Sequence, residues 1–256
     1  MHAELEQRLS FCGNLPTLPV VALRIIALAN DPEVHLNDVA KVIAIDPALV
    51  TKLFRAANSP LYGRRRQATN LRQVLNLLGL RGSLSLALSF SLVATAREAR
   101  VIPLDIEQFW RRSLLTATAC RILGERLALK NLEELFLAGL LHGIGILALA
   151  IMMPDRYGVL LTDATDRQSG MSNALDCERL AKLEQERLEV DHPQVGAWLL
   201  RRWGLPDYLC HAAAGSLNPG DSAAPEQHRT LVECVALAAR IADIWIRPGF
   251  WLHSPR

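Results

Sequence analysis

Apolar residues, mostly leucine and alanine, fill a series of segments in this sequence, and proline, asparagine and glycine separate the segments. Leucine and alanine favour helices, and runs of the β-branched and aromatic residues typical of strands are few. The pattern therefore predicts about a dozen helices and no sheet. The predicted helices span residues 19–29, 36–44, 47–57, 70–78, 82–96, 106–127, 132–141, 144–152, 174–188, 193–203, 206–213 and 230–246.

Short local signals predict where helices begin and end and where the chain divides. Asp46-Pro47 combines an N-cap residue with proline at the first helical position. Gly79 supplies a left-handed residue that ends the helix before it. The stretch 97–104 is the best candidate for a boundary, which predicts an N-terminal lobe over residues 1–100 and a second lobe over residues 101–256.

Residues 135–153 form an uncharged run that approaches the length of a membrane span. Gly139, Gly143, Gly145 and His142 interrupt this run. Such residues weaken a helix that faces lipid, but they suit helices packed on all sides by protein. We therefore expect the run to lie in the protein core, with a membrane span as the alternative.

Composition excludes several classes of protein. The chain has 256 residues, of which 50% are hydrophobic and 5% aromatic, and a formal net charge of +2. This apolar content excludes a disordered chain, and the small charge gives no global attraction to nucleic acid or membranes. The 5 cysteines form no C-x-x-C pair, and residues 1–10 contain no apolar leader, so we expect a cytoplasmic protein without disulfides or a zinc finger.

Arg64, Arg65 and Arg66 form the strongest local concentration of charge. A guanidinium cluster of this kind could bind phosphate, in nucleic acid or in a nucleotide messenger. The alternative is a solvated loop that keeps a leucine-rich protein in solution.

Residues 36–58 resemble the helix-turn-helix of LacI-type repressors. Ala44 stands where those repressors have glycine in the turn, and the second helix begins with Pro47, a poor residue for reading base edges. The segment carries only three basic residues against two acidic ones. DNA binding through this element is an alternative, but we expect no nucleic-acid partner.

Nucleophilic and nucleotide-hydrolysing chemistry has little support in the sequence. There is no G-x-S-x-G motif and no phosphate-binding glycine loop. His142 stands at a helix end beside glycine, where it could donate to a free backbone carbonyl and be purely structural. A hydrolytic metal site needs three or more protein ligands, and the nearest carboxylates before His142 are Glu133 and Glu134.

Four separated stretches together resemble the HDOD domain, a bacterial signalling relative of the HD phosphohydrolases. They cover residues 15–246 in the family's order and spacing. The stretches are LPTLP at 15–19; DPAL at 46–49, with ANS at 57–59 and Tyr62-Gly63; FWRRSL at 109–114, with GLLHGIG at 139–145; and HPQVGA at 192–197, with WGLP at 203–206.

This resemblance implies an all-α HDOD fold, in which an N-terminal helical lobe packs on an HD-like helical lobe. It also implies where HD enzymes would hold metal. Arg112 stands in place of the first histidine, His142 matches the histidine of the His-Asp pair, and Gly143 replaces its aspartate. His192 matches a later histidine. The late aspartate falls near Ala239, with Asp243 one turn further on.

The resemblance therefore predicts a non-catalytic regulatory protein with no metal and no cofactor. We expect it to act through signalling proteins in trans, with links to cyclic di-GMP, stress or motility control. The pocket of Arg112, His142 and His192 is the expected site for a partner, a nucleotide or another anion. A residual metal-dependent phosphohydrolase is the remaining alternative.

Overall fold

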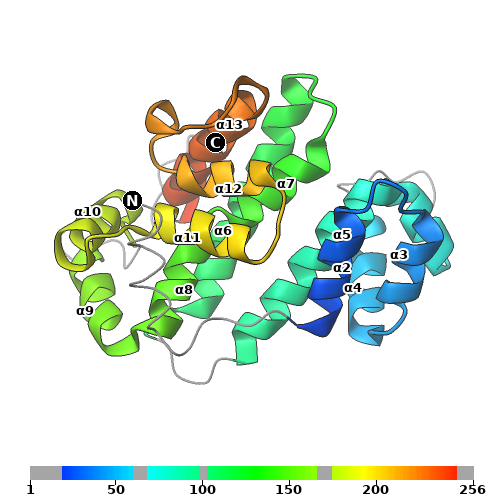
Figure 1. The fold of residues 1–256 in the computed structure, drawn as a ribbon, viewed down its shortest axis with the longest axis horizontal. Coiled ribbons are helices and arrows are strands. Elements are labelled where there is room, and N and C mark those ends of the chain that lie inside the picture. Colours follow the sequence, from blue (N-terminus) through cyan, green and yellow to red (C-terminus); the bar gives the residue numbers. More distant parts are fainter. Residues whose placement is uncertain (1–18, 60–67, 99–102, 166–174, 247–256) are drawn as a thin grey trace, which may run out of the picture. The chain divides into compact units, whose positions relative to one another are not determined.

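The computed structural model describes residues 19–59, 68–98, 103–165 and 175–246. These residues are helical, and they contain no β-strand beyond one isolated bridge between Thr165 and Leu175. The predicted all-α fold is confirmed (Figure 1). The chain divides between Glu98 and Ala99 into two compact units, here called the N-terminal unit and the C-terminal unit. The packing of one predicted lobe on the other stays a prediction.

The N-terminal unit gathers its first helices around the last one. Helices α2, α3 and α4 each pack against α5, and Ile25, Leu53 and Leu75 are among the side chains buried there. Asp46 caps α4, because its Oδ1 accepts hydrogen bonds from the amides of Ala48 and Leu49, as predicted. The helices are α2 (Val20–Ala29), α3 (Leu36–Ile43), α4 (Pro47–Ala57) and α5 (Leu71–Glu98).

Gly79 divides α5 into the two helices that the sequence predicts. Its φ of 72° lies in the left-handed region, where glycine meets no steric penalty. Asn58, which follows α4, pairs with the backbone of Ala68 through both ends of its amide. Arg64, Arg65 and Arg66, predicted as a possible anion-binding cluster, lie outside the described residues.

The C-terminal unit is built around α6, which packs against α7 and α13. Helix α11 packs between α8 and α12, and α9 packs against α10 (Figure 1). The helices are α6 (Ile106–Arg126), α7 (Leu132–Leu141), α8 (Ile144–Met152), α9 (Pro154–Ala164), α10 (Cys177–Leu188), α11 (His192–Arg202), α12 (Asp207–Ala214) and α13 (Glu226–Ile246), with a short 3-10 helix at Pro219–Asp221.

Among the residues that the structure describes, two helical stretches are long and apolar enough to cross a membrane, at Leu71–Ser91 and Leu132–Met152. In the most apolar part of each, 67% and 94% of the residues are buried inside the protein. Packing therefore accounts for the apolar character of residues 135–153, in agreement with the core location that the sequence predicts. Gly145 shows how close this packing is, since a Cβ atom there would lie 1.9 Å from the carbonyl oxygen of His192.

The sequence did not predict α9. Pro154 directly follows the uncharged run 135–153, and it occupies the first turn of this helix. Proline is well tolerated at that position, because its missing amide hydrogen would have no partner within the helix. Helix α13 also begins four residues earlier than the predicted residue 230, at Glu226.

Candidate functional site

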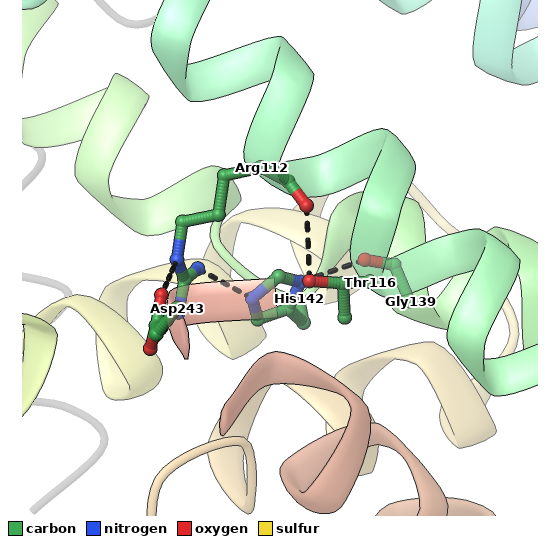
Figure 2. A network of polar contacts seen from close by, with 5 residues as sticks. All are labelled: Arg112, Thr116, Gly139, His142 and Asp243. Carbon is green, nitrogen blue, oxygen red and sulfur yellow. Dashed lines mark hydrogen bonds and ion pairs between the residues drawn. The ribbon is translucent and has the colours of Figure 1, made fainter. Parts of the chain in front are cut away.

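Arg112 and His142 meet inside the C-terminal unit, where α6, α7 and α13 pack together (Figure 2). The Arg112 side chain extends from α6, and its Nη1 lies 2.7 Å from Nε2 of His142. His142 follows the last turn of α7, and its Nδ1 lies 2.7 Å from the carbonyl oxygen of Gly139. The predicted structural contact of His142 with a backbone carbonyl is thus present.

These contacts determine the protonation state of His142. A carbonyl oxygen can only accept, so Nδ1 carries the proton and donates to Gly139. Nε2 then accepts a hydrogen bond from Arg112. Burial and the neighbouring Arg112 charge lower the pKa of His142 to about 3, so the imidazole is neutral at physiological pH. The Nε2 lone pair, which is the one that a metal could use, already accepts a hydrogen bond from the Arg112 guanidinium.

Asp243 on α13 completes the arrangement from the opposite side. Arg112 Nε lies 2.5 Å from Asp243 Oδ1, and Nη2 lies 3.0 Å from Oδ2, which is a bidentate ion pair. Burial lowers the pKa of Arg112, but the nearby Cys177 and Asp243 side chains outweigh this effect, so the pKa lies above its ordinary value. The Asp243 side chain remains 27% exposed. We call Arg112, His142 and Asp243 the arginine network.

His192 lies in a second buried group of polar side chains, formed with Glu184 and Tyr157. Glu184 Oε2 accepts hydrogen bonds from the His192 backbone amide and from His192 Nδ1, both at 2.7 Å. Glu184 Oε1 accepts a hydrogen bond of 2.5 Å from the Tyr157 hydroxyl. Glu184 has no exposed surface. We call these three residues the glutamate network.

The two networks are electrostatic neighbours. His192 contributes to the lowered pKa of His142, and Cys177 interacts with Arg112, Asp243 and Glu184. Burial raises the pKa of the Cys177 thiol to about 12 despite the Arg112 charge. A thiol with this pKa is protonated and a poor nucleophile at neutral pH. The site thus offers no activated cysteine.

The site residues do not fit a hydrolytic metal ion. Within the described part of the chain, no group of three or more histidine, cysteine, aspartate or glutamate side chains is arranged to hold a metal. The position between His142 and Asp243 is filled by the guanidinium of Arg112. At residue 143, a Cβ atom would lie 3.8 Å from Arg112 Nη1, so any side chain there would also face this cation.

The sequence identified part of this site. Arg112, His142 and His192 were predicted, and all three are buried in the C-terminal unit. Asp243 was noted only as lying one turn beyond the expected aspartate, whereas it is the bidentate partner of Arg112. Glu184 was missed. The signal that could have found it is helical spacing. Cys177, Leu180 and Glu184 follow one another at intervals of three and four residues, which places the carboxylate on the buried face of α10.

Comparisons with known proteins show the family and the fold. The HDOD domain family profile matches residues 15–219. An HDOD domain protein of unknown function from Geobacter sulfurreducens has a solved structure that matches with a TM-score of 0.74 and 26% identity, covering 93% of this chain and 78% of that one. A candidate phosphohydrolase from Shewanella amazonensis SB2B shares the fold, with a TM-score of 0.73 and 23% identity over 95% of this chain and 81% of that one.

A longer relative is also similar in sequence. An uncharacterised protein of Treponema pallidum (strain Nichols) is 26% identical over 226 residues, which cover 88% of this chain. This chain spans only 41% of the length of that relative. The family profile covers most of the present chain, and the all-α fold accords with the solved structure of an HDOD domain protein. The chain therefore belongs to the HDOD family.

Proposed function

We propose that this chain is a regulatory HDOD module that acts in the cytoplasm through contacts with other proteins and does not catalyse phosphate-ester hydrolysis. One observation carries the proposal. The Arg112 guanidinium occupies the position between the His142 imidazole and the Asp243 carboxylate, where it satisfies both. A fixed positive charge there repels a divalent cation, and a metal could enter only if the buried ion pair were broken.

The chemistry of metal-dependent hydrolysis explains why an arginine at position 112, in place of the histidine of HD enzymes, matters. A hydrolytic metal lowers the pKa of a bound water and polarises the phosphoryl oxygen. Its protein ligands must offer lone pairs or negative charge. Here the His142 lone pair and both Asp243 oxygens are engaged by Arg112, and Gly143 offers no carboxylate. Activation of water by a metal at this position therefore has no support in the side chains present.

The same arginine supports a narrower role for the site. A guanidinium that already binds a carboxylate through two parallel hydrogen bonds has the geometry to bind a phosphate or carboxylate of a ligand. Such a ligand must displace Asp243, which is the more exposed partner of the pair. A nucleotide such as cyclic di-GMP is the ligand class that we propose, alongside signalling proteins in trans.

An activity assay tests the non-catalytic proposal. The wild-type chain, purified without chelator, is incubated with Mn²⁺, Fe²⁺, Mg²⁺ or Zn²⁺ and with bis(p-nitrophenyl) phosphate, cyclic di-GMP or nucleoside phosphates. We expect no turnover above that of His142→Ala. Metal-dependent turnover that His142→Ala abolishes would overturn the proposal.

Calorimetry tests the ligand. Cyclic di-GMP is titrated into the wild type, into Arg112→Ala and into Arg111→Ala, which removes an exposed arginine one position away on α6. We expect heat of binding in the wild type and in Arg111→Ala and a loss of affinity in Arg112→Ala. Equal binding by all three proteins would rule out the Arg112 pocket as the ligand site, and no binding by any would rule out this ligand.

A further inference from the structure

Two histidines outside both networks approach each other between α12 and α13. His211 lies in the last turn of α12, and His228 lies near the start of α13. Their Nδ1 atoms are 3.0 Å apart, and the ring planes are inclined by 43°. Both side chains are half-buried, so solvent and small ions can reach them. We call this pair the histidine clasp.

The separation of the two nitrogens matches neighbouring ligands of one metal ion. With metal–nitrogen bonds of 2.0–2.1 Å, two nitrogens 3.0 Å apart subtend an angle of about 94° at the metal. A tetrahedral site would require about 3.3 Å between the nitrogens. An angle near 90° is that of neighbouring ligands in the square-planar and tetragonal geometries preferred by Cu²⁺ and Ni²⁺.

A neighbouring amide supports a metal-binding tautomer of His228. The Gln227 amide lies 3.5 Å from His228 Nε2. The two ends of an amide have similar shapes, so its oxygen can take the place of the nitrogen and accept from Nε2–H. That arrangement leaves Nδ1 of His228 without a proton, so that its lone pair can accept from His211 or bind a metal.

A third candidate donor stands one helical turn before His211 on α12. Asp207 precedes His211 by four residues, so the two side chains share one face of the helix, and the carboxylate acts on His211 electrostatically. The Asp207 side chain is exposed and is free to change rotamer toward the clasp. Arg201 opposes cation binding from the end of α11. Two imidazoles, one reorienting carboxylate and water would make a site of moderate affinity.

We propose that His211 and His228 bind a divalent transition-metal ion of the copper–nickel class, which joins α12 to α13. The site is independent of the arginine network and of the absence of hydrolysis. Because α13 also carries Asp243, the ion ties the start of the helix that closes the arginine network to the helix beside it. Metal binding at the clasp therefore stabilises the folded C-terminal unit.

Nickel titration of the full chain tests this proposal. All proteins carry His2→Ala and His253→Ala, so that the histidines near the two ends of the chain do not contribute. Isothermal calorimetry and thermal unfolding with NiCl₂ are compared for this reference protein, His211→Gln, His228→Gln and the control His35→Gln, which alters an exposed histidine in the N-terminal unit. We expect Ni²⁺ to bind the reference and the control alike and to raise their Tm.

Each clasp variant should weaken the Ni²⁺ affinity by more than about tenfold and remove the rise in Tm. Electron paramagnetic resonance of the Cu²⁺ complex should show two imidazole nitrogens in the reference and one in each clasp variant. A reference protein that binds no Ni²⁺ would overturn the proposal and leave the pair as a hydrogen bond between histidines. Equal binding by His228→Gln would overturn it as well.

Discussion

His142 and His192 are both almost fully buried, at 3% and 2% exposure, yet their surroundings are opposite in charge. His142 donates from Nδ1 to a backbone carbonyl and accepts at Nε2 from the Arg112 cation. His192 donates from Nδ1 to the Glu184 carboxylate, which also accepts the His192 backbone amide. One imidazole is therefore held beside a positive charge and the other beside a negative one.

Under the proposed function, this difference explains why the two buried histidines do not hold a hydrolytic metal. A carboxylate behind the imidazole is the usual support of a metal-binding histidine, and His192 keeps that support. In His142, the Nε2 lone pair accepts a hydrogen bond from Arg112 instead. The charge of Arg112 is balanced in turn by Asp243. The Arg112 guanidinium joins α6, α7 and α13, and under the proposed function the site has no Lewis-acid chemistry.

The largest expected effect comes from breaking the glutamate network. Glu184→Ala would leave three buried donors without an acceptor, and we expect a loss of about 3–5 kcal/mol in the free energy of unfolding. Chemical denaturation measures it. Glu186→Ala removes an exposed carboxylate from the same helix and should change stability by no more than about 0.5 kcal/mol. Equal losses in the two variants would contradict the account of Glu184.

Breaking the arginine network should cost less. Arg112→Ala leaves His142 Nε2 without its donor and Asp243 without its partner, but Asp243 is partly exposed and can be hydrated. We expect a loss of about 2–3 kcal/mol, against little change in Arg111→Ala. In a double-mutant cycle, Arg112→Ala with Asp243→Ala should cost less than the sum of the single variants. Strict additivity would show that the ion pair contributes nothing.

The pH dependence of stability should separate His142 from the other histidines. The pKa of His142 is about 3 in the folded protein and 6.5 in the unfolded chain. Between these values only the unfolded chain binds the proton, so stability falls as the pH is lowered from 6.5 toward 3. From pH 7.5 to pH 5.5, the wild type should lose about 1.4 kcal/mol relative to His142→Gln. A constant difference between the two proteins would show that His142 has the same pKa in the folded and unfolded chain, and would contradict the account.

The smallest effect is expected at Gly143. A Cβ atom there would lie 3.6 Å from Phe109 and 3.8 Å from Arg112, which are ordinary contact distances. Gly143→Ala should therefore change stability by less than about 1 kcal/mol. Gly145→Ala is the contrasting variant, since its Cβ would meet the His192 carbonyl oxygen and force α8 and α11 apart. Similar thermal unfolding of the two variants would contradict this packing.

Local signals were sufficient to predict most of the helices. Asp46-Pro47 and Gly79 act through backbone conformation and capping, which depend on a few neighbouring residues. Helix α9 was missed because Pro154 can either end one helix or begin the next. The choice depends on how Tyr157 packs against α10, which no local pattern reveals.

Only the site residues that lie in the family-like motifs could be predicted from the sequence. Arg112 and His142 lie within stretches that resemble the family, and the consequence of exchanging histidine for arginine followed from charge alone. The partner carboxylates lie 131 residues from Arg112 and 8 residues from His192. Glu184 stands in a highly charged helix that is typical of a solvated surface, so only its place on the buried face distinguishes it from its neighbours.

Metal retention tests the central claim most directly. The wild type, His142→Ala and the double variant Arg112→His/Gly143→Asp are exposed to Mn²⁺ and dialysed, and the bound metal is quantified. The account predicts that the wild type retains no more Mn²⁺ than His142→Ala and that the double variant retains about one ion, because removal of the guanidinium frees His142 and Asp243 to act as ligands. Stoichiometric Mn²⁺ in the wild type, lost in His142→Ala, would contradict it.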